Sequence, residues 1–157
     1  MFVDRFLVSC PDIWEHLLSD RYISFLQSKY FLYHSLEKKD GYRLNQIGFD
    51  VRHVPMWIKK TFGIHESIIT VDEEVEYDED QHVMNWTVQD RSHPDLFSLC
   101  GQTRIEDGGA IDVTIRFQSP WIIFDRYISS IIFREIRSTY KEFLYHPSTI
   151  HHPRKEN

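Results

Sequence analysis

The side chains with the most distinctive chemistry are basic residues in a chain that is acidic overall. The chain carries 18 lysines and arginines against 24 aspartates and glutamates, a formal net charge of −6. The bases that fall on predicted helices or at their ends are Arg21, Lys59, Lys60, Arg134, Arg137 and Lys141. Guanidinium and ammonium groups bind phosphate. If these six side chains converge over an apolar cavity, they form a cationic mouth for a lipid with a phosphate head. The alternative is that they are ordinary solvated residues of helix surfaces.

Residues 54–63 combine basic and apolar chemistry most closely. Pro55 opens this segment, because proline near a helix start has its φ preset and loses no needed donor. Trp57, Ile58 and Phe62 give the segment an apolar side, and two adjacent lysines add charge. A short amphipathic helix of this kind suits a lid over an apolar cavity, or a surface that touches lipid head groups. The alternative is a connecting helix whose tryptophan packs on the core.

The remaining reactive side chains predict neither a catalytic site nor a metal site. Cys10 and Cys100 are expected to be reduced thiols, and no sequence signature places a histidine beside Cys100. The acidic run 72–80 lacks the pattern of a calcium loop, so the solvated face of a strand and its turn is expected. No cofactor is predicted. The histidines near the C-terminus are assigned to a flexible tail over residues 147–157.

Alternation of apolar and polar residues predicts the elements that position these side chains. The pattern is clearest in residues 69–78, 84–89 and 111–117, and Glu73 is the one break in the apolar face of the first run. One buried and one wet face is typical of antiparallel strands, and the short connections predict a meander. Further elements are expected as strands over residues 2–8, 25–34, 42–51 and 96–105 and as a helix over 13–21, with Asp12 and Glu15 as its capping box.

After Pro120 the apolar period changes to that of a helix. Apolar residues recur at i, i+3 and i+4 through residues 127–144, which predicts one long C-terminal helix. The order of elements predicts an α+β, START-like helix-grip fold, in which a curved antiparallel sheet wraps around that helix. An apolar cavity is expected between them, with residues 111–117 and 128–136 facing the same interior.

Length and composition predict one globular domain over residues 1–146. A chain of 157 residues, 41% apolar and 15% aromatic, can bury a single core. No apolar run approaches the roughly 18 residues that span a bilayer, and the N-terminus has no cleavable signal pattern. The acidic balance disfavours nucleic acid as a partner.

The segment 54–59, Val-Pro-Met-Trp-Ile-Lys, resembles the Leu-Pro-x-Trp-Val-Lys element of the PRELI-like family, the phospholipid-transfer proteins of the mitochondrial intermembrane space. Residues 68–73 and 84–88 are similar to the family's strands in order and spacing. Residues 20–22, Asp-Arg-Tyr, lie where the family has a turn that ends its first helix. The resemblance covers nearly the whole chain.

The resemblance implies a protein that is not an enzyme and that carries phosphatidic acid or phosphatidylserine between membranes. It also implies transient contact with a membrane surface, a small helical twin-cysteine partner protein and a location in the intermembrane space. Arg21 and Lys59 match the family's phosphate-facing residues. The complete predicted ligand-binding set is Arg21, Trp57, Lys59, Lys60, Arg134, Arg137 and Lys141. Two alternatives stay open: a START-like enzyme with a histidine or a carboxylate pair in its cavity, and a protein-binding module of the same fold.

Overall fold

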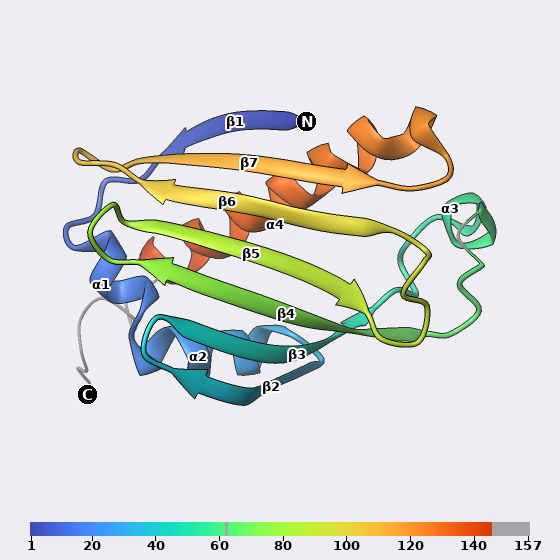
Figure 1. Cartoon of the computed structure of the whole chain (residues 1–157), viewed down its shortest axis with the longest axis horizontal. Helices are drawn as coiled ribbons and strands as arrows, with labels where there is room; N and C mark the ends of the chain where they lie inside the picture. Colours follow the sequence, from blue (N-terminus) through green and yellow to red (C-terminus); the bar gives the residue numbers. More distant parts are fainter. Residues whose placement is uncertain (62, 146–157) are drawn as a thin grey trace.

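The computed structural model describes residues 1–61 and 63–145, and it contains one antiparallel sheet (Figure 1). The sheet has seven strands in the order β1-β7-β6-β5-β4-β3-β2. The strands are β1 (Phe2–Leu7), β2 (Leu32–Lys39), β3 (Tyr42–Asp50), β4 (Ile68–Asp78), β5 (Val83–Asp90), β6 (Ser98–Ile105) and β7 (Ala110–Gln118). From β2 to β7 each strand pairs with its successor, which is the predicted meander.

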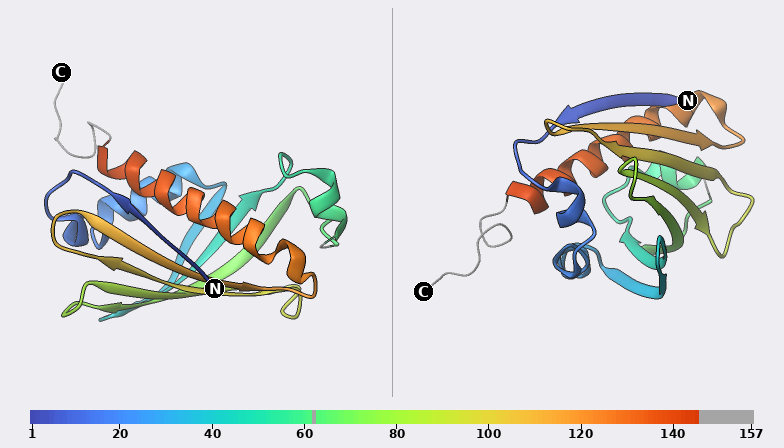
Figure 2. Two further views of the ribbon diagram at one scale, coloured as in Figure 1. Left: turned by 90° about the horizontal axis from the view of Figure 1, so that it is seen from above. Right: turned by 60° about the vertical axis from the view of Figure 1, so that its left-hand side comes forward.

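The helices lie in the connections and at the C-terminal end of the described chain. They are α1 (Ile13–Leu17), α2 (Asp20–Lys29), α3 (Met56–Thr61), the 3₁₀ turn η1 (Ile122–Phe124) and α4 (Asp125–Tyr145). Figure 2 shows α4 crossing one face of the curved sheet, with α1 and α2 on the same side. We call this the inner face and the opposite one the outer face.

Alternation along the strands explains why the sheet buries its inner face. Ile111, Val113 and Ile115 of β7 are fully buried and pack in one cluster with Phe133 and Phe143 of α4. Their neighbours in sequence point to the outer face, because successive side chains of a strand alternate. The predicted fold class, an α+β helix-grip with the sheet wrapped around the C-terminal helix, is therefore confirmed.

Two tight turns depend on glycine. Gly41, between β2 and β3, has φ +73°, a left-handed conformation that residues with a Cβ atom rarely adopt. Gly109, before β7, has φ +92°, and a Cβ atom there would collide with the carbonyl oxygen of Val8. The second turn therefore lets β7 begin next to the chain that leaves β1.

The segment between β1 and β2 differs from the prediction. Residues 25–29 belong to α2 instead of a strand, because Tyr22, Phe25 and Leu26 lie on one side of the helix and pack into the interior. The predicted 13–21 helix is divided into α1 and the start of α2. The predicted capping box is also wrong, since Asp12 has left-handed φ and makes no side-chain cap hydrogen bond.

Some expectations concern residues outside the described ranges. They are the apolar contribution of Phe62, the end of the domain at residue 146 and the flexible tail over residues 147–157. Within the ranges that the structure describes, no helix is both long and apolar enough to cross a membrane.

Candidate functional site

Polar side chains interrupt the inner face where β3 and β4 pair. Arg43 lies opposite Val75, and Asn45 lies opposite Glu73, in the alternation phase that faces the helices. The side chain of Tyr33 on β2 faces the same region, since its strand partner is the buried Ile47. We call Arg43, Asn45, Glu73 and Tyr33 the interior polar cluster.

The interior polar cluster contains buried atoms without a hydrogen-bond partner. Asn45 is 1% exposed and Arg43 is 5% exposed. The amide Nδ2 of Asn45 donates a hydrogen bond to Oε1 of Glu73 over 3.1 Å. The amide Oδ1 of Asn45 and the Nε of Arg43 have no partner among the described residues. Buried polar atoms are nearly always hydrogen-bonded, so this acceptor and this donor are open to water or to a bound group.

The local electrostatics make Glu73 an unusual carboxyl group. Burial raises the pKa of Glu73, while the hydrogen bond from Asn45 and the positive charge of Arg43 oppose that rise. Burial also raises the pKa of Tyr33, with Glu73 acting in the same direction and Arg43 against it. Because Arg43 and Glu73 carry opposite charges when both are ionised, the cluster is close to neutral overall.

Several further phenols surround the cluster. Burial is the main cause of a raised pKa in each of Tyr22, Tyr30, Tyr77 and Tyr140, and the charge of Glu73 adds to all four. These side chains therefore stay protonated at neutral pH. Each offers an aromatic surface together with a hydroxyl group that can donate and accept hydrogen bonds.

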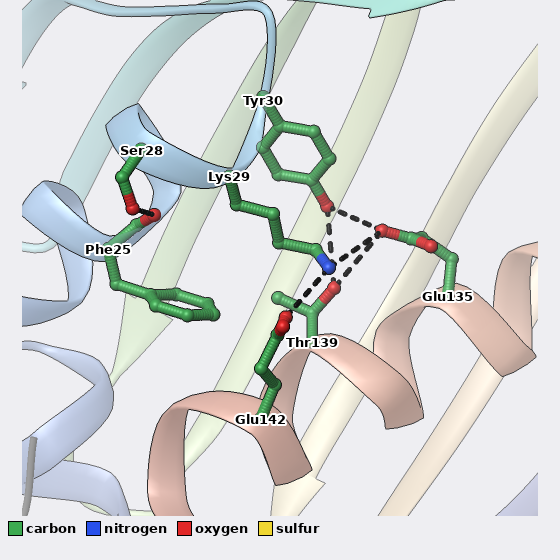
Figure 3. Close-up of polar contacts among 7 residues, drawn as sticks. All are labelled: Phe25, Ser28, Lys29, Tyr30, Glu135, Thr139 and Glu142. Atoms are coloured by element: carbon green, nitrogen blue, oxygen red, sulfur yellow. Dashed lines mark hydrogen bonds and ion pairs between the residues drawn. The ribbon is translucent and has the colours of Figure 1, made fainter. Parts of the chain in front are cut away.

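A group of polar contacts joins α2 to α4 beside this region (Figure 3). The hydroxyl of Tyr30 donates to Oε2 of Glu135 over 3.1 Å and lies 3.5 Å from Oγ1 of Thr139. The Nζ of Lys29 lies 2.9 Å from a carboxylate oxygen of Glu142 and 3.9 Å from one of Glu135. We call these five residues the α2–α4 clasp, because they hold the two helices together over the interior.

The arrangement supports two kinds of chemistry. The free acceptor on Asn45 and the free donor on Arg43 fit a hydroxyl group, which accepts and donates, on an otherwise apolar or aromatic molecule. The carboxyl group of Glu73 can exchange a proton with a bound molecule, and its burial raises its pKa above the ordinary value. Among the described residues there is no cluster of histidine, cysteine or carboxylate groups that could hold a metal ion.

The structure does not bring the two predicted phosphate ligands together. Arg21 lies at the start of α2, exposed, with a guanidinium nitrogen 3.1 Å from Nδ1 of His16. Its neighbour Asp20 pairs with Lys38, next to the β2–β3 turn. Lys59 lies on α3, which follows the other end of β3. Arg21 and Lys59 therefore lie near opposite ends of β3, a strand of nine residues that is about 26 Å long.

Residues Trp57, Lys59 and Lys60 do lie together on α3. The helix packs on the core through the buried Ile58, and Trp57 stays 48% exposed. The Trp57 ring contacts the rings of Phe124 and Tyr127, with centroids 5.2 and 6.3 Å apart. The tryptophan therefore joins α3 to the beginning of α4.

The remaining predicted bases lie along α4 and away from α3. Arg134 and Arg137 are exposed and Lys141 is half-buried, while the guanidinium of Arg137 lies over the ring of Phe133 at 5.6 Å. Lys141 is about 24 Å along the helix from Asp125, where α4 begins near α3. The six predicted bases thus do not converge into a single mouth.

Sequence reasoning missed Arg43 and Asn45, and it assigned Glu73 with its acidic neighbours to a solvated strand face. The signal was present in the alternation. Glu73 occupies the apolar phase of β4, and Arg43 and Asn45 share the phase of Ile47 in β3. The pairing of these two strands was needed to show that all three face the same interior.

Two shallow pockets lie on the outer face. One, of about 340 Å³, is lined mainly by outward side chains of β4, β5 and β6, including Glu74, Asn85 and Cys100. The other, of about 520 Å³, lies over β1, β6 and β7 beside Arg5. Neither lies between the sheet and α4, where an apolar cavity is predicted. The prediction that apolar side chains of β7 and α4 face the same interior is confirmed. Ile132 and Ile136 of α4 pack against the buried cluster that contains the inward side chains of β7.

Comparison with solved structures defines the class of protein. The crystal structure of Ara h 8.0201 aligns with a TM-score of 0.61 at 13% identity, over 92% of this chain and 96% of that one. The Zhui aromatase/cyclase from Streptomyces sp. R1128 aligns with a TM-score of 0.58 at 13% identity, over 90% and 91%. The di-domain ARO/CYC StfQ from the steffimycin biosynthetic pathway gives 0.57 at 11% identity, over 92% and 44%.

These structures share the START-like helix-grip fold with the present chain. No protein-family model matches the chain, and no curated protein matches it either. The comparison therefore confirms the predicted fold class, and it does so at the level of the fold.

The expectation that the protein is not an enzyme is corrected by the same comparison. The similar structures include aromatase/cyclases, so the fold carries catalysts as well as non-enzymes. The error arose because the absence of enzyme activity was inferred from one family resemblance, while the fold is shared by proteins of different activity.

Proposed function

We propose that this protein binds a neutral hydrophobic molecule with at least one hydroxyl group on the inner face of the sheet. The unpartnered Oδ1 of Asn45 and Nε of Arg43 carry this proposal. A ligand hydroxyl would satisfy both atoms, and the tyrosine rings would cover its apolar skeleton.

The balance of charge favours a neutral ligand. Arg43 supplies one positive charge and ionised Glu73 one negative charge, so an anionic group placed between them would gain little. Bare acyl chains also fit poorly, because they would leave the buried polar atoms of Asn45 and Arg43 without a partner. A polycyclic or aromatic alcohol meets both requirements.

The test compares 2-naphthol with 2-methoxynaphthalene by isothermal titration calorimetry. In 2-methoxynaphthalene a methyl group replaces the hydroxyl hydrogen, so the ether can accept a hydrogen bond but cannot donate one to Asn45 Oδ1. We expect 2-naphthol to bind about tenfold more tightly, since a single satisfied buried hydrogen bond contributes about 1 kcal/mol or somewhat more. The Asn45→Leu variant should lose this preference for the hydroxyl compound.

Asn85→Leu is the matched control, because Asn85 lies on the outer face and accepts a hydrogen bond from Gln102 over 3.1 Å. It should keep the preference. Equal binding of both compounds to the unmodified protein would refute the proposal, as would an Asn45→Leu variant that still prefers the hydroxyl compound.

A second candidate function is transfer of an anionic phospholipid, phosphatidic acid or phosphatidylserine, between membranes. It is supported by the exposed Trp57 beside Lys59 and Lys60 on α3, and by the resemblance of this segment to the PRELI-like family. The twin-cysteine partner protein and the intermembrane-space location belong to the same proposal.

A transfer assay between donor and acceptor liposomes tests this candidate. Lys59→Ala should reduce transfer of phosphatidic acid about tenfold, because a charge-assisted contact contributes about 1.5–3 kcal/mol. Arg21→Ala is informative in the same assay, since Arg21 lies at the far end of β3. Normal transfer by both variants would exclude a phosphate contact at these residues.

A further inference from the structure

Exposed large apolar side chains lie on α3 and around the beginning of α4. These two segments lie at the same end of the molecule (Figure 1). We call this set the apolar tip, and it consists of Met56, Trp57, Trp121, Ile122, Ile123 and Tyr127. Ile122 and Ile123 are 80% and 83% exposed. Single exposed apolar residues are common, but six on adjoining segments are unusual for a surface that faces only water.

The two segments that carry the apolar tip are in contact. The ring of Trp57 on α3 contacts Phe124 of η1 and Tyr127 of α4, which joins the two segments. The rest of the tip is held by the 3₁₀ turn, in which the backbone N–H of Phe124 donates to the carbonyl of Trp121 over 3.0 Å. The tip is therefore built on short helical turns anchored by the buried Ile58 and by α4.

Basic residues border the apolar tip. Lys59 and Lys60 are on α3, and within the described ranges neither makes an ion pair. Arg126 is exposed in the first turn of α4, where its guanidinium lies 5.7 Å from the ring centre of Phe2. The nearby carboxylate of Asp125 accepts a hydrogen bond from Ser119 over 2.8 Å. The border is thus cationic on a chain with a net charge of −6.

We infer that the apolar tip docks on the surface of an anionic lipid bilayer. The isoleucines and Met56 would enter the boundary between head groups and acyl chains, with the aromatic rings at head-group depth. Lys59, Lys60 and Arg126 would face the anionic head groups. An apolar centre with a basic border matches a bilayer surface in both respects. This inference goes beyond the proposed binding of a hydroxylated ligand, because it does not depend on what the interior binds. It also names the surface by which the second candidate, phospholipid transfer, would meet a membrane.

Sedimentation with vesicles tests the inference directly. The probes are vesicles of phosphatidylcholine alone and vesicles in which about a third of the lipid is phosphatidylglycerol. We expect the full chain to bind the mixed vesicles, and Ile122→Asp with Ile123→Asp to lower the partition coefficient about tenfold or more, because two apolar side chains no longer leave water. Lys59→Gln with Lys60→Gln should lower binding less, and only at low salt.

Matched controls have the same chemical changes elsewhere on the molecule. Leu7→Asp with Leu36→Asp changes two exposed apolar residues on β1 and β2, and Lys38→Gln with Lys39→Gln removes two adjacent lysines at the β2–β3 turn. Both controls should bind vesicles as the unmodified chain does.

Three outcomes would overturn the inference. They are no binding of the unmodified chain to either vesicle, equal losses in the control variants, and a tip variant that changes only the oligomeric state in light scattering. The last result would identify the tip as a contact between two copies of the chain. None of these results concerns the binding of 2-naphthol, so failure here and failure of the proposed function are distinguishable.

Discussion

The inner face of the sheet has two unlike parts. Under α4, Ile111, Val113 and Ile115 are fully buried against other apolar side chains. Near α2, the corresponding inward positions of β3 and β4 include Arg43 and Glu73. The first part is a closed hydrophobic core, whereas the second leaves polar atoms buried without partners. The comparison leads us to expect that stability comes mainly from the α4 part, while the proposed ligand would bind in the α2 part.

The division follows from the packing of the helices. Phe143 of α4 is fully buried and contacts Tyr22 and Phe25 of α2, so the two helices meet above the core. Beyond that junction a second, smaller apolar cluster lies under α2, formed by Leu26, Tyr33, Ile47 and Val71. The polar residues lie where the two clusters adjoin, which is where a ligand would contact both.

The largest loss of stability is expected from a substitution in the closed hydrophobic core under α4. Phe143→Ala should lower the free energy of unfolding by about 3–5 kcal/mol, because it opens a cavity among fully buried side chains. Urea titration followed by circular dichroism measures this loss. The preference for 2-naphthol should remain in the folded fraction. A loss below about 1 kcal/mol would mean that the α4 part is not the main source of stability.

A smaller loss is expected in the middle of β6. A Cβ atom at Gly101 would collide with the ring of Trp86, whose Nε1 donates to Thr103 over 3.1 Å. Gly101→Ala should therefore cost about 1–3 kcal/mol through overpacking. Thermal unfolding gives the measurement, and an unchanged transition would show that the indole moves without cost.

A substitution in the polar part should raise the free energy of unfolding, whereas the two substitutions above lower it. Burial raises the pKa of Glu73 in the folded chain above its ordinary value of 4.5. At a pH between the ordinary pKa and the raised pKa, the folded chain holds a proton that the unfolded chain has released. Stability therefore falls as pH rises through this window, and Glu73→Gln removes the fall. The variant should be more stable than the unmodified protein at pH 8 and nearly equal to it at pH 4.5.

Urea titrations of both proteins at pH 4.5, 6 and 8 give the difference curve. A flat curve would show that Glu73 titrates normally and that the interior is more hydrated than its burial implies. Ligand binding sharpens the comparison further, because the stabilised Glu73→Gln variant should bind 2-naphthol with altered affinity.

The smallest effect is expected in the α2–α4 clasp. Lys29→Met should cost about 0.5 kcal/mol or less, since Glu142 and Glu135 are about half exposed and water screens their attraction to Lys29. The same change should have no effect in 1 M salt. A loss above about 1 kcal/mol at high salt would show that the clasp is a packing contact.

The architecture was largely predictable because its signals are local. Strict alternation in β4, β5 and β7 and the change to helical period in α4 specify a meander followed by a long helix. α2 was less predictable, because aromatic residues such as Tyr22 and Phe25 favour strands, and their helical conformation depends on packing against Phe143. Tertiary contacts override weak propensities of this kind.

The sequence alone determined which residues of each strand share a face, and it marked Glu73 as the exception in the apolar phase of β4. Only the tertiary structure decided what that exception means, because the register between β3 and β4 places Asn45 opposite Glu73. The same holds for the bases. Their positions on helices predicted one cationic mouth. In the structure, Arg21 and Lys59 lie near opposite ends of β3, which is nine residues long. Distances across a sheet depend on strand order and register, which local periodicity does not encode.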